Sequence, residues 1–122
     1  MTVDTKGSKT TIEGDAKLIQ VDYSNHESIK HALAGVDVVI STVAIAALNV
    51  QEKIAAAAKE ADVKLFVPSE FGGNSEEQCH TEGLVHGVKA NIQGQLKALG
   101  LPYAGFYTGP FSDYFWTSYV SR

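Results

Sequence analysis

Residues 36–42 read Val-Asp-Val-Val-Ile-Ser-Thr, and this β-branched run decides the fold. An apolar run without polar alternation is typical of a strand that is buried in a parallel sheet. A second run of this kind occupies residues 63–67. Between the two runs, residues 49–61 are rich in alanine and carry an apolar residue every four positions, which gives a helix one apolar face. The three segments predict a strand–helix–strand unit with parallel strands.

The alternation of strand and helix extends toward the amino end. Residues 17–22 read as a short strand. We expect a helix over about residues 26–34, with Ser24 as its N-cap and Glu27 at the capping-box position. Gly35 is suited to end that helix because glycine tolerates the conformation of a C-terminal cap.

Toward the carboxyl end, a loop over about residues 69–81 precedes a long amphipathic helix over 84–99. A further strand is expected over 103–108, and an aromatic tail follows over 111–119. Strands that alternate with helices of ten residues or more predict βαβ units and a parallel sheet flanked by helices. The chain of 122 residues is therefore expected to form one α/β domain.

The composition argues against several classes of function. The net charge is -4 and the ten basic residues are scattered, so they form no surface for nucleic acid. Cys79 is the only cysteine, and no apolar run is long enough for a signal peptide or a membrane span. The four histidines lack the spacing of metal ligands. We expect a cytoplasmic or nuclear protein that binds neither nucleic acid, membrane nor metal.

Three stretches carry a resemblance to a known family. They are residues 35–43, the Phe-Val-Pro-Ser-Glu-Phe-Gly motif at 66–72, and the segment from Lys89 through Leu-Pro-Tyr at 101–103 to Gly-Pro-Phe at 109–111. In order and spacing they resemble the NmrA-like and isoflavone-reductase-like group of atypical short-chain dehydrogenases, over about residues 15–119. The Pro-Ser-Glu-Phe-Gly motif is its more specific part, whereas Val-Asp-Val-Val-Ile-Ser strands occur in many Rossmann folds.

This resemblance implies a Rossmann-like domain with NADP as its cofactor. In that family, a glycine-rich loop after the first strand holds the pyrophosphate. No Gly-x-Gly-x-x-Gly or Gly-x-x-Gly-x-x-Gly sequence occurs in this chain. We therefore expect a partial Rossmann-like sheet that lacks the first βα unit, so that residues 1–122 form a single, incomplete NAD(P)-binding domain. Such a chain is expected to bind a dinucleotide weakly or not at all by itself.

The resemblance also indicates candidate site residues at the carboxyl ends of the strands, where ligands of open α/β sheets bind. The candidate cofactor contacts are Asp22, Thr42, Val43, Pro68, Ser69, Phe71, Lys89, Tyr107, Thr108 and Gly109. The alternatives are a capping role for Asp22 and plain strand-end packing for Thr42 and Val43. Glu70 has no obvious catalytic task and is expected to hold its loop by accepting N–H bonds.

Lys89 is the candidate catalytic residue. It matches the lysine that isoflavone-reductase-like enzymes use near the nicotinamide ribose and for acid–base chemistry. One helical turn earlier, where ordinary short-chain dehydrogenases carry the tyrosine of a Tyr-x-x-x-Lys pair, this chain has Val85. The usual tyrosine acid is therefore absent, which fits the atypical branch. The alternative for Lys89 is a surface lysine on a helix.

The aromatic tail has two interpretations. Phe111, Tyr114 and Phe115 are candidates for an apolar substrate pocket. They are equally suited to form core against a further part of the protein, which is the interpretation that we prefer. An uncovered tail or an open sheet edge would be a site of association, so a homo-oligomer is a further expectation.

Three functions fit these features. The first is a reductase that uses NADPH on a small aromatic or carbonyl-conjugated substrate, with Lys89 as the proton donor. The second is a non-catalytic regulator that binds NAD(P), senses its redox state and docks on a protein partner. The third is a truncated chain that lacks its own activity and acts through protein–protein contacts. The absence of tyrosine at position 85 fits both of the first two.

Overall fold

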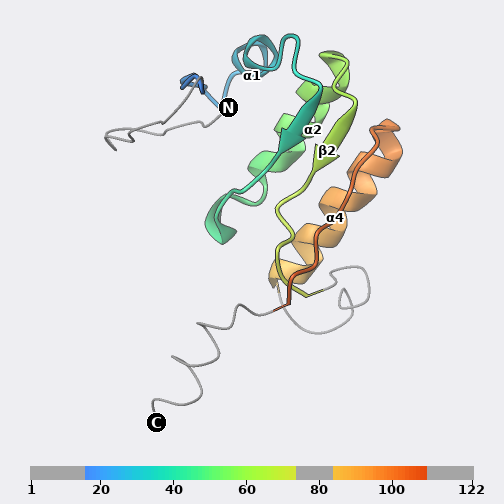
Figure 1. Ribbon diagram of the computed structural model, residues 1–122. Helices are drawn as coiled ribbons and strands as arrows, with labels where there is room; N and C mark the ends of the chain where they lie inside the picture. The colour runs from blue at the N-terminus through green and yellow to red at the C-terminus, as the bar shows by residue number, and fades with distance from the viewer. Residues whose placement is uncertain (1–15, 74–83, 110–122) are drawn as a thin grey trace.

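The computed structural model describes residues 16–73 and 84–109 (Figure 1). Its elements, in chain order, are α1 (His26–Ala32), β1 (Val38–Ile40), the 3-10 helix η1 (Ile45–Ala47), α2 (Val50–Glu60), β2 (Leu65–Val67) and α4 (Leu84–Leu99). The aromatic tail, with the substrate-pocket candidates Phe111, Tyr114 and Phe115, lies outside the described residues.

The two strands form a parallel pair, as the sequence predicts. Val39 lies opposite Phe66, and the ladder continues to Ser41, whose N–H donates to the carbonyl of Val67 at 2.8 Å. A third segment lies on the other side of β2, where Tyr103 forms a parallel bridge with Phe66. Because α2 connects β1 to β2, the described chain contains a βαβ unit, and the α/β expectation is confirmed.

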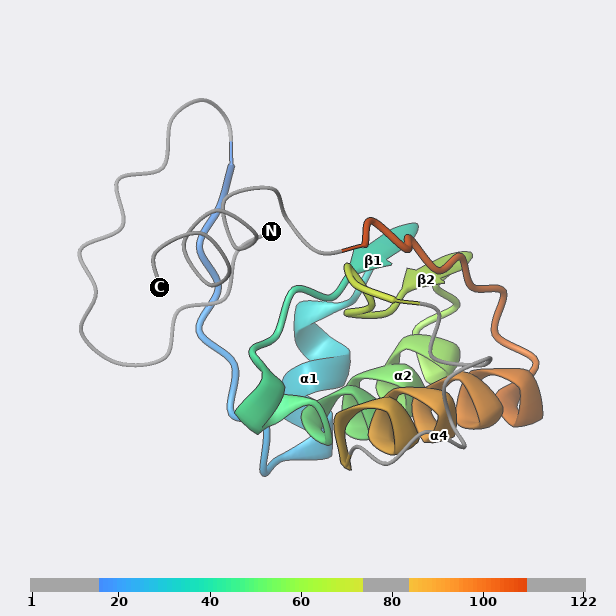
Figure 2. The same cartoon turned by 90° about the horizontal axis from the view of Figure 1, so that it is seen from below.

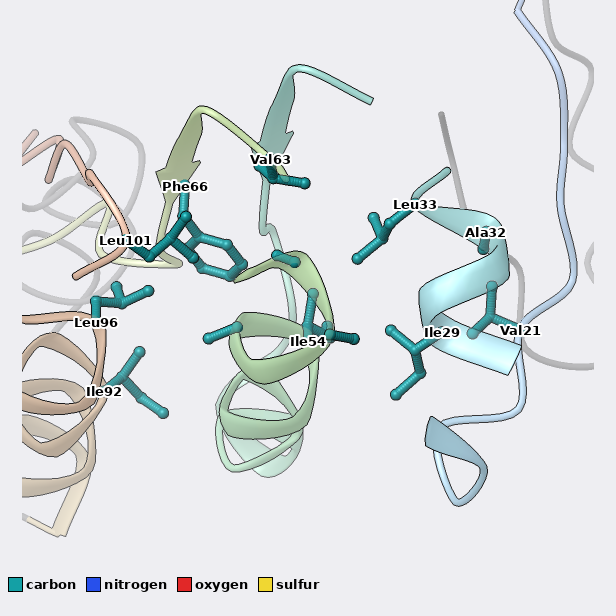
Figure 3. Packing of buried hydrophobic residues seen from close by; sticks show 13 residues of the cluster. Val21, Ile29, Ala32, Leu33, Ile54, Val63, Phe66, Ile92, Leu96 and Leu101 are labelled. Carbon is teal, nitrogen blue, oxygen red and sulfur yellow. The ribbon is translucent and has the colours of Figure 1, made fainter. Parts of the chain in front are cut away.

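The three α-helices cover one face of the sheet, and the core lies between the two layers (Figure 2). The core extends from α4 through Phe66 and Ile54 to α1 (Figure 3). Phe66 is fully buried and so are Ala55, Ala57 and Ala58, whose small side chains let α2 approach the sheet closely. The apolar face predicted for residues 49–61 therefore packs on the sheet.

The other face of β1 departs from the expectation of a strand buried on both sides. Val38 is 47% and Ile40 64% exposed, whereas Val39 packs against the core. Side chains alternate across a strand, so only every second residue of β1 points toward the helices. No helix among the described residues covers the opposite face.

The predicted strand over 17–22 is wrong. Leu18 makes only an isolated bridge, and Leu18 and Ile19 are 47% and 37% exposed. Val21 enters the core, but among the described residues the segment has neither a partner strand nor a continuous buried face to stabilise it.

Ser24 was also the wrong N-cap for the helix that follows. Asn25 caps α1, because its side-chain oxygen accepts the N–H groups of Glu27 and Ser28 at 3.0 and 3.3 Å. The hydroxyl of Ser24 instead donates to Asp22 at 2.6 Å. The helix ends at Ala32, two residues earlier than expected, with Leu33 as its C-cap.

The strand predicted over 103–108 is limited to the bridge at Tyr103. Phe66 donates its N–H to Pro102 and accepts one from Ala104, at 2.9 and 3.1 Å. The next donor of a parallel ladder would be the N–H of Pro68, which proline lacks. The ladder therefore stops, and the chain beyond Ala104 is free to follow the loop after β2 instead.

Candidate functional site

The loops at the carboxyl ends of β1 and β2 are joined through Ser69. The hydroxyl of this buried serine donates to the carbonyl oxygen of Val43 at 3.0 Å. Its backbone N–H donates at 2.8 Å to Oε1 of Gln51, a residue of α2 that is 1% exposed. The N–H of Glu70 turns back to the carbonyl of Pro68 at 2.8 Å, which makes the turn tight. The ends of β1 and β2 and the Gln51 side chain of α2 thus fix the short loop that begins after β2.

The segment that follows Tyr103 lies against the same loop. Phe71 donates its N–H to the carbonyl of Phe106 at 2.9 Å, and Gly109 donates to the carbonyl of Gly72 at 3.1 Å. Phe71 has a φ of 37°, a conformation that an L-residue with a large side chain rarely adopts. Such a residue costs on the order of 1–3 kcal/mol and is retained where surrounding contacts determine the backbone.

Lys89 and Glu70 form the polar centre of this end of the molecule. The Glu70 side chain is 1% and the Lys89 side chain 12% exposed. The Lys89 ammonium donates a short hydrogen bond to the Glu70 carbonyl, and its Nζ lies 3.8 Å from the carboxylate Oε2. A Cβ added at Gly72 would lie 3.9 Å from Nζ, so this glycine leaves the loop open next to the cation.

Gln93 connects this pair to the neighbouring segment. Its Nε2 donates to Glu70 Oε1 at 2.6 Å and to the hydroxyl oxygen of Tyr107 at 3.0 Å. A carboxylate only accepts hydrogen bonds, so the amide nitrogen must face Glu70, and the amide Oε1 is left buried without a hydrogen-bond partner. Glu70, Lys89, Gln93 and Tyr107 are called the Glu70 network below.

The structure brings most of the predicted site residues to one end of the sheet. The loops after β1 and β2, the segment after Tyr103 and helix α4 together carry Val43, Pro68, Ser69, Phe71, Lys89, Tyr107 and Gly109. Thr42 is exposed next to Val43, and Thr108 is exposed next to Gly109. Glu70 accepts bonds, as the sequence indicates, but it does so from side chains of α4.

Asp22 stands apart from this set. It is exposed, and its hydrogen bonds lie within residues 22–28, in the turn before α1. The hydroxyl and N–H of Ser24, and to a smaller extent the charge of Lys53, lower the pKa of this carboxyl. These contacts favour the structural role that the sequence left open for Asp22.

Sequence reasoning missed Gln51 and Gln93, which are both 1% exposed. A signal was present for Gln93, because it lies four residues after Lys89 and therefore on the same side of the helix. For Gln51 the signal was a polar residue within an apolar, alanine-rich helix. Neither signal identifies the partner, since that depends on how the loop after β2 folds.

A hollow of about 270 Å³ lies between η1 and the first turns of α2 and α4. Its lining is Ile45, Ala46, Leu48, Asn49, Val85 and Val88. The lining is apolar except for Asn49, and such a surface suits an apolar or aromatic group. The hollow occurs because η1 separates β1 from α2, a feature that the sequence did not reveal.

Within residues 16–73 and 84–109, no group of three or more His, Cys, Asp or Glu side chains comes close enough together to hold a metal ion. None of the described helices has the length and apolar character that crossing a membrane requires.

A parallel sheet with polar groups gathered at the carboxyl ends of its strands defines a Rossmann-like α/β domain. The comparison with known proteins is more specific. The chain belongs to the NmrA-like family, whose model its sequence matches over residues 2–122.

Curated relatives support this assignment. The chain is 43% identical over 101 residues to phenylcoumaran benzylic ether reductase POP1 of Populus trichocarpa, with 80% of this chain and 33% of the relative covered. It is 41% identical over 102 residues to eugenol synthase 2 of Clarkia breweri, again with 80% and 33% covered. The chain thus spans about a third of the length of these relatives.

Solved structures show the same partial coverage. A chain from the crystal structures of pinoresinol-lariciresinol and phenylcoumaran benzylic ether reductases superposes with a TM-score of 0.77 at 32% identity, covering 83% of this chain and 35% of that one. AtPrR2 with NADP+ and (+)pinoresinol gives a TM-score of 0.75 at 33% identity, covering 80% and 34%. The fold and its order of elements are therefore those of these reductases.

Proposed function

We propose that this chain is part of the single NAD(P)-binding domain of an NADPH-dependent reductase, with Lys89 as its essential acid–base group. The proposed substrates are small aromatic or carbonyl-conjugated molecules, in keeping with the relatives named as phenylcoumaran benzylic ether reductase and eugenol synthase. The observation that carries the proposal is the placement of Lys89. Its side chain is 12% exposed, and its ammonium lies beside Glu70 at the carboxyl end of the sheet.

The described residues fit the nicotinamide side of an NADP cofactor. Helix α4 places the Lys89 ammonium beside Gly72 of the loop after β2, and the missing side chain of this glycine leaves room next to Nζ. Thr42, Val43 and Ser69 would flank the same region from the ends of β1 and β2. The 122 residues contain no glycine-rich motif for the pyrophosphate, so contacts to that group are expected from outside this sequence. When bound, NADPH supplies two electrons and a hydrogen as hydride.

The chain's own residues would hold and orient the reacting groups. The tight turn at Ser69 fixes the loop, and the bond from Phe71 to the Phe106 carbonyl fixes the segment opposite it. Lys89 would provide positive charge and a proton where the substrate gains negative charge. The apolar hollow near Val85 and Val88 would take an aromatic ring of the substrate.

The first experiment is calorimetric titration of the folded chain with NADPH and with NADH, after circular dichroism. We expect weak or no binding by the chain alone, because the pyrophosphate contacts are missing. Sub-micromolar binding would contradict this expectation and would mean that other residues hold the pyrophosphate. Binding that appears only when an upstream glycine-rich βα unit is supplied would support the proposed domain.

Turnover tests the role of Lys89. With an upstream glycine-rich βα unit supplied, substrate-dependent NADPH oxidation is expected to fall by about 100-fold or more in Lys89→Ala, the usual loss when an acid–base group is removed. Lys97→Ala is the matched control, since it removes an exposed lysine from the same helix. Equal activity in the two variants would exclude Lys89 as the acid–base group.

The second candidate function is a regulator that binds a dinucleotide without turnover and docks on another protein. The exposed apolar face of β1 favours this alternative, whereas the valine at position 85 fits both functions. Tight NAD(P) binding without substrate-dependent oxidation would support it. Concentration-dependent oligomers or folding that needs an upstream segment would instead indicate a fragment that acts through protein contacts.

A further inference from the structure

We propose that Tyr107 is a second catalytic residue of this site and donates the proton to the oxygen of the substrate. The inference rests on the proposed reductase function. A reductase with Val85 lacks the tyrosine that commonly stands one turn before the catalytic lysine. The fold links a different tyrosine, from the segment after Tyr103, to the lysine through Gln93 and Glu70.

Tyr107 belongs to the same bonded network as Lys89. Its hydroxyl oxygen accepts a hydrogen bond from Gln93 Nε2 at 3.0 Å, and the same nitrogen donates to Glu70 Oε1 at 2.6 Å. The other carboxylate oxygen of Glu70 lies 3.8 Å from Lys89 Nζ. One buried amide therefore links the phenol to the Glu70–Lys89 pair.

Gly105 shows that the tyrosine ring occupies a defined place. A Cβ at position 105 would lie 2.7 Å from the Tyr107 hydroxyl oxygen and 2.8 Å from Cζ. Real Cβ atoms do not approach this closely, so any residue other than glycine would displace the ring. The phenol thus folds back over its own segment toward Gln93, and the absence of a side chain at 105 permits it.

Tyr107 is also accessible, which a proton donor to a substrate must be. It is 41% exposed, whereas Gln93 and Glu70 are 1% and 3% exposed. Tyr107 is thus the most exposed residue of the Glu70 network. The backbone bonds from Phe71 to Phe106 and from Gly109 to Gly72 hold its segment against the loop after β2.

The proposed proton transfer accompanies hydride transfer from the NADPH of the proposed function, and the two together balance in atoms and charge. A carbonyl carbon accepts the hydride, and the electron pair of the broken C=O π bond moves to the oxygen. The O–H bond of Tyr107 breaks, its proton bonds to that oxygen, and the product is an alcohol. The N–H of Gln93 stabilises the phenolate, which regains a proton from water. In this refinement Tyr107 takes over from Lys89 the role of proton donor, and Lys89 acts through its positive charge, which offsets the charge of Glu70 beside the amide.

The test uses an aromatic ketone, 4-hydroxyacetophenone labelled with 13C at the carbonyl carbon, and infrared difference spectra of the folded 122-residue chain. A proton donor that bonds to the carbonyl lowers its stretching frequency. We expect this shift in the wild type and in Tyr103→Phe, which removes a hydroxyl outside the Glu70 network. The shift should disappear in Tyr107→Phe and in Gly105→Ala, which keeps the phenol but displaces its ring.

No shift in the wild type, or an equal shift in Tyr107→Phe, overturns the assignment. A second arm measures oxidation of NADPH with the same ketone, with an upstream glycine-rich βα unit supplied in all variants. Tyr107→Phe should lower kcat by about 100-fold, the usual scale for loss of a proton donor, and leave KM little changed. No oxidation by the wild type overturns the proposed function itself, whereas activity that survives in Tyr107→Phe overturns only the role of Tyr107.

Discussion

Two glutamates ten residues apart have opposite environments. The side chain of Glu60, at the end of α2, is 49% exposed and accepts hydrogen bonds from Lys30 at 3.0 Å and His26 at 3.1 Å. The side chain of Glu70, after β2, is 1% exposed. It accepts a hydrogen bond from the neutral amide of Gln93 at 2.6 Å, and Nζ of Lys89 lies 3.8 Å from its Oε2.

The number of cationic partners does not show which of the two carboxylates contributes more to stability and to the geometry of the site. Water screens the exposed ion pairs of Glu60, and such pairs contribute little to stability. A buried carboxylate loses its hydration, so each donor that replaces water is costly to remove. We therefore expect the larger effects on both stability and site geometry at Glu70, although Glu60 has the better ion pairs.

The largest expected effect comes from Gln93→Leu. This change keeps the size of the side chain but removes the N–H donor to Glu70 Oε1 and to Tyr107. A hydrogen bond to a buried charged group is worth on the order of 2–3 kcal/mol, so the free energy of unfolding should fall by about that amount. Urea denaturation followed by circular dichroism measures the loss.

Gln95→Leu provides the matched control on the same helix. Its amide donates only to the neutral backbone carbonyl of Glu52, at 3.3 Å, and its Oε1 is buried without a partner. The cost of removing it should be clearly smaller. Equal losses in the two variants would mean that the Gln93 amide does not stabilise the carboxylate, and the contrast between the two glutamates would fail.

The next effect in size is expected for Gln51→Leu. This change removes the side-chain oxygen that accepts the Ser69 N–H at 2.8 Å, in a buried position. A buried N–H left without its acceptor costs on the order of 1–3 kcal/mol, and we expect about 1–2 kcal/mol here because the bond is between neutral groups. Hydrogen exchange at the Ser69 amide should accelerate. Unchanged exchange at that amide would show that Gln51 does not hold the loop.

The sequence was sufficient for the elements that follow from apolar periodicity. The predicted helices over 84–99 and about 49–61 are found, and so is the parallel pairing of the two apolar runs. The segments 17–22 and 103–108 were misjudged, because a strand requires an extended ladder and the described residues give each segment only an isolated bridge. Pro68 lacks the N–H that would extend the ladder beyond Tyr103, and that effect depends on a register that the sequence does not show.

The site could be predicted only in part. Lys89 and the loop after β2 were indicated by a family motif and by the rule that ligands bind at the carboxyl ends of parallel strands. Gln93 and the role proposed for Tyr107 could not be predicted, because their contacts depend on the path of the segment after Ala104. The assignment of Lys89 as the catalytic residue stays a prediction.

A smaller effect is expected for Lys30→Met, which removes one partner of Glu60 and keeps an unbranched side chain. Lys30 and Glu60 are both well exposed, so the change in unfolding free energy should be close to the error of the measurement. Whatever loss is seen should shrink further when the salt concentration is raised, because salt screens exposed charges. A loss as large as that of Gln93→Leu would show that burial does not decide between the two glutamates.

The smallest effect is the pH dependence that Glu60 contributes. The Lys30 ammonium and then the His26 ring lower the pKa of this carboxyl below its ordinary value of 4.5. A carboxyl whose pKa is lower in the folded chain stabilises the fold above the unfolded value, and this contribution is lost as the pH falls through the folded value. Glu60→Gln should therefore flatten the fall in stability slightly below pH 4.5 and leave neutral pH almost unchanged. Lys30 responds at the other end of the scale, because Glu60 raises its pKa above 10.5 and its contribution is lost as the pH rises through that raised value. Urea denaturation of the wild type and of Glu60→Gln across acidic pH measures the difference in unfolding free energy. Identical pH profiles would mean that solvent screens the Glu60 pairs completely.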